Sequence, residues 1–262
     1  MAFVLTLGIA VYQRTTGPTY PISGEKTIAG ENIEYRLTRS HGGEGDEVIP
    51  IVAPDEDISG VMSYRRYRSH DQWKTEPLER SGDTLKARIP HQPPAGKVQY
   101  HIILISPEGE KIPLTENPLT IRFKGDVPAW ALIPHIIFIF GAMLISTRTG
   151  LEAFYGGRRV MPFIIITLIG LFFGGFVFGP IVQKFAFGVY WSGWPFGQDL
   201  TDNKTLVALI FWAIAFFRIR KNPGKTGWAV VAAIVLIVVF LIPHSLLGSE
   251  LDYTKLDAEQ AV

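Results

Sequence analysis

Cysteine is absent from this chain of 262 residues. The protein therefore cannot form disulfides, ligate metals through thiolates or use a thiolate as a nucleophile. A domain exported without disulfides is more typical of a bacterial envelope than of a eukaryotic cell surface. Long basic runs are absent as well, and the formal net charge is +1, so the sequence gives no support to nucleic-acid binding.

Catalytic signatures are also lacking. The sequence contains no nucleophile elbow, phosphate-binding loop, metalloprotease helix or paired-carboxylate signature. Its apolar segments show no inverted repeat and few charged residues, which weakens a transporter interpretation. The sequence thus does not indicate an enzyme, and a membrane electron-transfer component is the enzymatic class that we keep open.

Long apolar stretches dominate the second half of the chain, at residues 127–147, 160–182, 206–217 and 228–247. A helix that rises about 1.5 Å per residue needs about 20 apolar residues to cross a hydrocarbon layer of about 30 Å. Three stretches meet this length, and the one at residues 206–217 is short. We therefore predict an α-helical transmembrane bundle of four clear spans at residues 127–247, with the lipid bilayer as its first partner.

Residues 1–12 (MAFVLTLGIAVY) form a further apolar segment of about half that length. No Lys or Arg precedes it and no small-residue cleavage site follows it, unlike in a secretory signal peptide. We interpret it as an uncleaved fifth span that lacks its beginning, within an anchor and linker at residues 1–19. A short signal anchor or a helix lying in the membrane interface is the alternative.

Charge placement predicts the orientation of the spans. The loops at residues 147–159 and 218–226 contain seven basic residues and one acidic residue, whereas the tail at 248–262 contains four acidic residues and one lysine. Basic loops stay in the cytoplasm. We therefore expect both loops inside, and residues 20–125 and the tail outside, the cytoplasmic (inner) membrane of a bacterium.

Residues 20–125 change to short alternating strands separated by Gly, Pro and Asp. The candidate strands lie at residues 32–38, 47–52, 60–68, 84–89, 97–105 and 119–123. Their number and spacing are typical of a sandwich of two antiparallel sheets. The fold class that we predict is therefore mixed, with an extracytoplasmic all-β sandwich and a transmembrane helical bundle.

Two neighbouring segments of this region carry a family resemblance. Residues 85–90 (LKARIP) and 93–102 (PPAGKVQYHI) resemble the closing strands of bacterial Ig-like or fibronectin-III-like extracytoplasmic modules. The resemblance implies an Ig-like sandwich. It leaves the function open, because such modules serve in adhesion, as spacers and in assembly alike.

One predicted strand is rich in arginine and tyrosine. Residues 63–70 (SYRRYRSH) place Arg65, Arg66 and Arg68 among Tyr64 and Tyr67. Tyr and Arg are enriched at protein interfaces, so this strand could bind a protein. The alternative is an exposed strand whose long side chains cover apolar surface of their own domain.

Glycine recurs at helical spacing within the stretch 160–182, at Gly170, Gly174, Gly175 and Gly179. Glycines one turn apart let another helix approach closely, which is a main way in which helices associate in lipid. We predict that this span packs centrally in the bundle. A glycine-lined groove for a substrate or cofactor is the alternative.

Two histidines lie within apolar stretches, and each directly follows a proline: His135 and His244. Ionisable residues inside spans are costly and are therefore candidates for function. The two imidazoles could ligate a haem b iron or a metal ion. Alternatively, they hydrogen-bond the carbonyls that the prolines leave without a donor.

The loop at residues 185–205 combines six aromatic residues with three glycines, a composition typical of a segment at the membrane surface. Asp199, Thr201 or Asp202 could cap the following helix, which we expect to begin near Lys204. The alternative makes Asp199, Asp202 and Lys204 an outward-facing polar site together with the two histidines.

Three functional hypotheses remain. The first is a membrane protein whose Ig-like domain binds partners in the membrane or envelope, as an accessory, assembly or interaction subunit of a complex. The second is a redox subunit that holds haem b or a metal through His135 and His244. The third is a small transporter or channel that uses the region of Asp199 and Asp202.

Reporter fusions test the predicted orientation. Alkaline phosphatase is active outside the cytoplasm, so we expect activity when it is fused after Val262 and none when it is fused after Arg220. A fluorescent protein that matures only in the cytoplasm should give the opposite pattern. Activity of phosphatase in the loop, or its inactivity at the tail, would contradict the orientation.

Overall fold

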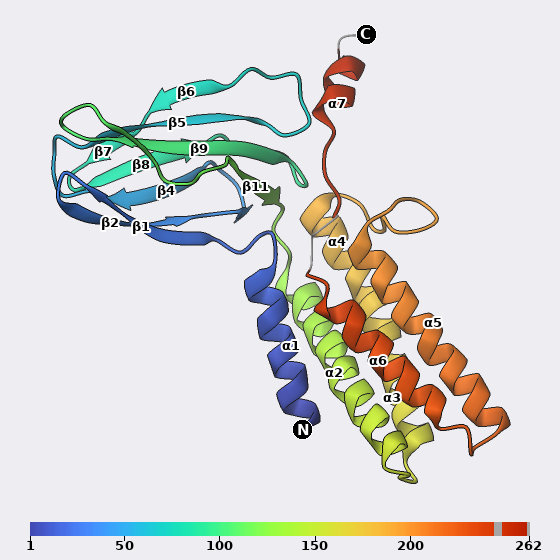
Figure 1. Cartoon of the computed structure of the whole chain (residues 1–262). Coiled ribbons are helices and arrows are strands. Elements are labelled where there is room, and N and C mark those ends of the chain that lie inside the picture. The colour runs from blue at the N-terminus through green and yellow to red at the C-terminus, as the bar shows by residue number, and fades with distance from the viewer. Residues whose placement is uncertain (244–247, 261–262) are drawn as a thin grey trace. The chain divides into compact units, whose positions relative to one another are not determined.

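The computed structural model describes residues 1–243 and 248–260 and divides into two compact units (Figure 1). The helical unit contains Met1–Pro18 and Val127–Ser249. The β unit contains Thr19–Asp126 and the segment that begins at Glu250. The chain therefore passes between the two units three times, after Pro18, after Asp126 and after Ser249.

Eleven strands make up the described part of the β unit, and six of them lie within two residues of the predicted strands. Those six are β2 (Glu31–Leu37), β4 (Glu47–Val52), β5 (Ser59–Arg66), β8 (Thr84–Ile89), β9 (Lys97–Ile105) and β11 (Leu119–Lys124). The other five are β1 (Ile22–Ile28), β3 (Ser40–Gly42), β6 (Lys74–Pro77), β7 (Glu79–Ser81) and β10 (Lys111–Pro113).

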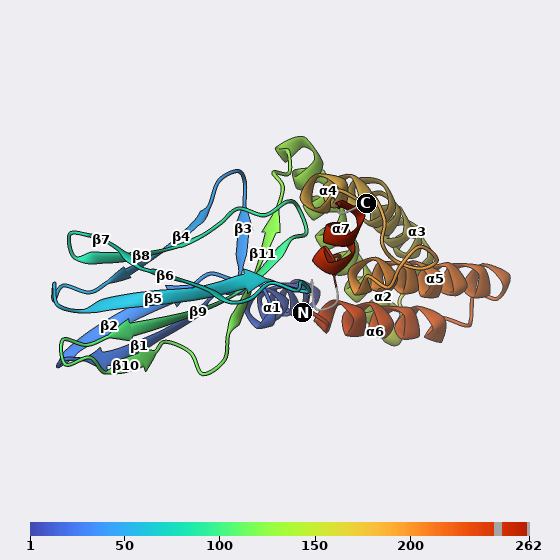
Figure 2. The same ribbon diagram turned by 90° about the horizontal axis from the view of Figure 1, so that it is seen from above.

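The strands form three sheets in the described residues. The largest has the order β3-β11-β9-β5-β6, with β10 also paired to β9. Its centre is the long antiparallel pair of β5 and β9, which lie side by side in Figures 1 and 2 and run in register from Ser59–Ile105 to Arg66–Val98. The second sheet has the order β4-β8-β7, and the third is the hairpin of β1 and β2.

Alternating burial explains why these segments fold as strands. Along β9, Val98, Tyr100, Ile102 and Leu104 are buried while their neighbours are partly exposed. Successive side chains of a strand point to opposite faces, so this pattern places four apolar side chains on one face. They join residues from β1, β2, β4, β5, β8 and β11 in a single core, so the three sheets are held by one continuous apolar interior.

The hairpin of β1 and β2 turns through two residues, Ala29 and Gly30, because Ile28 is paired with Glu31. Both turn residues have positive φ, 51° and 83°. A two-residue hairpin with positive φ at both positions matches the right-handed twist of its strands. The alanine is unusual in this conformation, which explains why this hairpin carries only a weak turn signal in the sequence.

The helical unit contains three helices that are long and apolar enough to cross a membrane, counted over the described residues. They are α2 (Ala129–Phe154), the continuous helix Val160–Phe187, and α5 (Leu200–Lys221). The continuous helix consists of α3 (Val160–Leu171), a π-helical stretch η1 (Phe172–Phe178) and α4 (Gly179–Phe187). The chain is thus a membrane protein by the length and composition of these helices.

The expectation of four clear spans is met in part, and the short helix is not the one expected. α5 has 22 residues because it continues through polar residues at both ends of its apolar stretch. α6 (Gly227–Leu241) has only 15 residues, because Pro243 excludes the preceding residue, Ile242, from helical geometry. α1 (Ala2–Thr16) also has 15 residues, and residues 244–247 lie outside the described part of the chain.

The glycines of the helix Val160–Phe187 lie against neighbouring helices. A Cβ atom on Gly170 would come within 2.9 Å of the Ala142 methyl group of α2, and one on Gly174 within 2.9 Å of the backbone nitrogen of Ile139. Gly175 instead meets Thr205 of α5. Pairs of small residues thus allow close contact of this helix with both α2 and α5.

Substitution of these glycines by alanine tests the close approach. We expect Gly170→Ala to lower the free energy of unfolding in detergent by about 1–3 kcal/mol relative to Gly141→Ala. A Cβ on Gly141 would meet nothing within 4 Å, and both changes bring the same gain in helix propensity. Equal stability of the two variants would contradict close packing at Gly170.

Candidate functional site

Three of the polar residues singled out in the sequence gather at one end of the helical unit. We call this the polar end; it comprises the start of α2 and α5, the end of α4 and α6, and the loop between α4 and α5. Asp199, Asp202 and Lys204 lie here at the beginning of α5, and each is less than 9% exposed. Buried charges require partners, because their transfer from water is costly.

Asp199 caps α5. Its Oδ1 accepts a hydrogen bond from the backbone N–H of Thr201 at 2.8 Å, so α5 begins at Leu200, earlier than the predicted start near Lys204. Its Oδ2 accepts from the backbone N–H of Ser249 at 2.8 Å and from the Ser249 hydroxyl at 3.0 Å. The same carboxylate therefore satisfies the helix start and holds the chain that follows α6.

Asp202 holds the aromatic loop. Its Oδ2 accepts from the backbone N–H groups of Ser192 and Gly193, at 2.8 and 3.0 Å. The next residue, Asn203, accepts from the backbone N–H of Trp194 at 2.7 Å. Three successive backbone donors of the loop are thus satisfied by the first turn of α5, while the rings of Trp194 and Phe196 remain exposed.

Lys204 serves the end of α6. Its Nζ donates to the carbonyl oxygen of Ile242 at 2.8 Å, and Gln13 of α1 donates to the carbonyl oxygens of Phe240 and Ile242 at 2.8 and 3.2 Å. The last carbonyls of a helix have no partner within the helix. Side chains from α1 and α5 supply the donors that α6 lacks because it stops before Pro243.

These contacts define what the polar end can do chemically. The carboxylates face backbone donors and hydroxyl groups, and the ammonium group faces a backbone carbonyl. Within residues 1–243 and 248–260, no group of three or more His, Cys, Asp and Glu side chains is arranged to hold a metal ion. The arrangement is that of an internal latch which fastens the loop and the segment after α6 to the start of α5.

His135 lies in α2, seven residues into the helix, and is not among the residues that contact Asp199, Asp202 or Lys204 in the described hydrogen bonds. Its Nδ1 is 2.9 Å from the carbonyl oxygen of Gly174, in the π-helical stretch η1. A carbonyl oxygen can only accept, so Nδ1 carries a proton, and in the neutral imidazole the lone pair is on Nε2. His244 lies outside the described residues, so its place relative to His135 is not defined.

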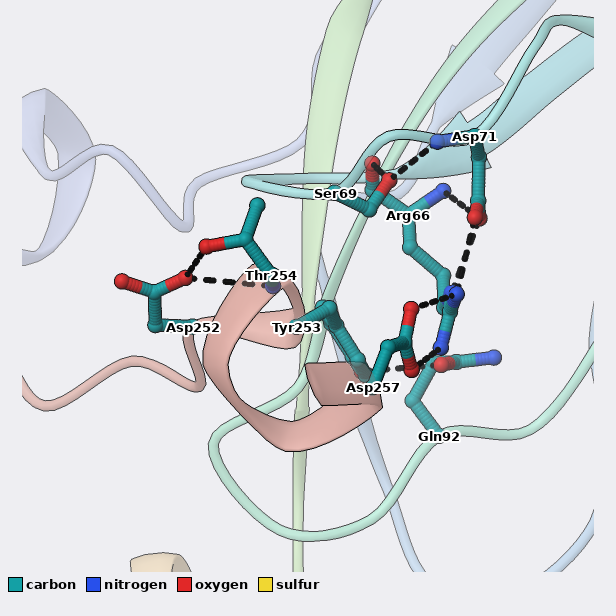
Figure 3. Close-up of polar contacts among 8 residues, drawn as sticks. All are labelled: Arg66, Ser69, Asp71, Gln92, Asp252, Tyr253, Thr254 and Asp257. Carbon is teal, nitrogen blue, oxygen red and sulfur yellow. Dashed lines mark hydrogen bonds and ion pairs between the residues drawn. The ribbon is translucent and has the colours of Figure 1, made fainter. Parts of the chain in front are cut away.

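The arginine-rich strand engages groups of its own unit. Arg66 donates from Nε and Nη2 to the two oxygens of Asp71, each at 2.8 Å, and from its two Nη atoms to Asp257 of α7 (Tyr253–Gln260), at 3.0 and 2.6 Å (Figure 3). These hydrogen bonds from Arg66 lower the pKa of Asp71 below its ordinary value. The pair therefore stabilises the folded state at neutral pH, and this stabilisation is lost as the pH falls through the lowered pKa.

Several residues of these clusters escaped the sequence reasoning. Ser192, Ser249 and Gln183 complete the hydrogen bonds of the polar end, with Gln183 donating to the Ser192 hydroxyl at 2.6 Å. A lone serine or glutamine in a loop carries no pattern. The acidic tail did carry a signal, because its charge complements the basic strand, but sequence alone does not show that the two meet.

The sequence matches no protein-family model, and no curated protein shows significant similarity to it. The function is therefore inferred from the contacts of the polar end and of the β unit.

Two substitutions at Asp202 separate a latch from a charged functional site. Asp202→Ala removes the acceptor of two backbone N–H groups, and each buried donor left without a partner costs about 1–3 kcal/mol. Asp202→Asn keeps an oxygen that can accept but removes the charge. We expect the alanine variant to be less stable in detergent unfolding and more readily cleaved in the loop, and the asparagine variant to resemble the wild type.

The opposite pattern would contradict the latch. An alanine variant as stable as the wild type would show that the loop does not depend on Asp202. Loss of a measured ion or proton flux in the stable asparagine variant would assign the charge to transport instead.

Proposed function

We propose that this protein is an accessory, assembly or interaction subunit of a complex in the inner membrane of a bacterium. Its helices anchor the chain in the bilayer. Its β unit is an Ig-like module on the outer side of the membrane that binds partner proteins of the envelope. The support for this proposal is that the buried charged side chains of the polar end form hydrogen bonds within the same chain.

The observation that carries the proposal is the occupation of Asp199 and Asp202 by backbone donors. A carboxylate that carries an ion or proton needs lone pairs directed at a path or ligand. Here the carboxylates bond the loop and the segment after α6, and Lys204 bonds the end of α6. All three residues thus hold parts of the same chain together, and this favours a structural role over transport.

The architecture of the β unit supports an Ig-like interaction module. Six predicted strands are present at the expected places, and the strand at residues 97–105 has the alternating burial of a sheet that covers a core. The β unit also exposes aromatic and charged side chains of the kind enriched at protein interfaces. An example is Trp73, whose ring centroid lies 4.6 Å from the Cζ atom of Arg65.

A redox subunit is the second candidate, and the geometry of His135 favours it. The hydrogen bond to the Gly174 carbonyl oxygen fixes the neutral tautomer with its lone pair on Nε2. Histidines that ligate metals commonly donate their other nitrogen to a backbone carbonyl in this way. A haem b iron or a metal ion held there would need further ligands, and His244 is the residue that the sequence suggests.

Purification from native membranes tests the proposal. We expect the protein, solubilised in mild detergent after cross-linking, to migrate well above the 29.2 kDa of the chain. Mass spectrometry should identify the same partner, with cross-links from residues of the β unit, in independent preparations. The purified complex should contain this protein and its partner in a constant ratio.

An absorption spectrum of the same preparation decides between the two candidates. A Soret band that is lost in His135→Ala but kept in His101→Ala would favour the redox subunit, because His101 lies in the β unit and bonds the Thr115 carbonyl oxygen. A protein that remains alone after cross-linking in native membranes would contradict the proposed function.

A further inference from the structure

The segment that begins at Glu250, which we call the tail from here on, packs on the rest of the β unit through one aromatic anchor. Tyr253 is only 4% exposed, and its hydroxyl donates to Gln92 Oε1 at 2.8 Å (Figure 3). A Cβ atom on Gly96 would come within 2.5 Å of that hydroxyl, so the glycine makes room for the ring. Arg66 covers the ring at 4.7 Å from its centroid, and burial raises the pKa of Tyr253 to about 12.

Charges flank this anchor on both sides. Asp257 pairs with Arg66, and Glu250 pairs with Arg68 at 2.8 Å and with Lys97. Lys97 also lies 5.6 Å from the centroid of the Tyr67 ring. Without the tail, Arg66, Arg68 and Lys97 would face solvent. Among the contacts described, Arg66 would keep Asp71 as an ion-pair partner.

The tail presents a simple recognition pattern, Glu250, then Tyr253 three residues later and Asp257 four residues after that. Two backbone hydrogen bonds orient it, from Leu251 N to the Ala95 carbonyl and from Thr254 N to the Arg68 carbonyl, at 3.2 and 3.1 Å. α7 has eight residues. A helix this short is not stable alone in water, so the surface of the β unit supports its conformation.

The tail leaves part of the surface uncovered. A groove of about 300 Å³ remains beside Arg66, lined by one acidic residue, Asp71, and by Tyr64, Arg65, Gln72, Lys74, Gln92 and Val98. Because Arg66 neutralises Asp71, the tyrosine ring, the amides, Arg65 and Lys74 leave a lining that suits an aromatic or acidic side chain. The binding surface is therefore larger than the segment that occupies it.

From these contacts we infer that the surface around Arg66, Arg68 and Lys97 is a binding site for an acidic helical segment of a partner protein, and that the tail occupies this site as an internal competitor. The inference rests on the proposed function, since it names the surface through which the β unit binds. A partner helix with the same acidic and tyrosine pattern, and with further side chains for the groove, displaces the tail.

A peptide with the sequence of residues 249–260 (SELDYTKLDAEQ), labelled with fluorescein, serves as the probe. Fluorescence anisotropy measures its binding to the full chain in nanodiscs, as wild type and as the release variant Tyr253→Ala with Asp257→Asn. A competitor that occupies nine-tenths of the sites raises the apparent Kd about tenfold. We therefore expect the peptide to bind the release variant at least about tenfold more tightly than the wild type.

Variants of the peptide keep the test independent of protein folding. Peptides with Tyr253→Ala or Asp257→Asn should lose binding to the release variant. The matched control Glu259→Gln removes the same charge at an exposed position two residues further on and should retain it. High salt should weaken binding, because ion pairs at a surface are screened.

Three outcomes would overturn the inference. They are no binding to the release variant, equal binding to both proteins, and equal loss with the Glu259→Gln and Asp257→Asn peptides. Wild-type protein that is dimeric, and monomeric as the release variant, would assign the site to the tail of a second copy instead. Failure of peptide binding leaves stable co-purification with a partner untouched, so it is distinguishable from failure of the proposed function.

Discussion

Hydrogen bonding of backbone groups at helix ends is the constraint on which the helical unit depends. In an apolar environment a carbonyl or N–H group without a partner costs several kcal/mol, and four helices of this unit, α2, α4, α5 and α6, end or begin at the polar end. Asp199 and Asp202 supply acceptors, and Lys204 and Gln13 supply donors. Because these residues come from α1 and α5, the short helix α6 depends on both of them for its end.

Much of the β unit follows from local pattern. The strands at residues 47–52, 84–89 and 97–105 were predicted with their observed bounds, because alternation and turn residues both indicated them. β1 was not predicted. Its sequence, ISGEKTI, contains a glycine and two charges, and its pairing with β2 depends on a turn through Ala29 that lacks the usual Asn-Gly or Asp-Gly signal.

The helices show the limit of counting apolar residues. The stretch at residues 206–217 appeared too short to span, yet α5 begins six residues earlier, because Asp199 caps it and because Asp202 and Lys204 are satisfied by tertiary contacts. Similarly, the sequence singled out Asp199, Asp202 and Lys204 but not their partners. Those partners are mostly backbone groups, which have no identity in a sequence and are brought close only by the fold.

The order of the chain gives the docking of α7 a consequence for assembly. The strands that receive Tyr253 and Asp257 are synthesised before α2, and the tail follows α6, so the whole helical region separates the two in the chain. During vectorial synthesis the arginine surface therefore lacks the tail until α6 has been synthesised. The partner segment proposed above would therefore meet no internal competitor at this surface before the tail has been synthesised.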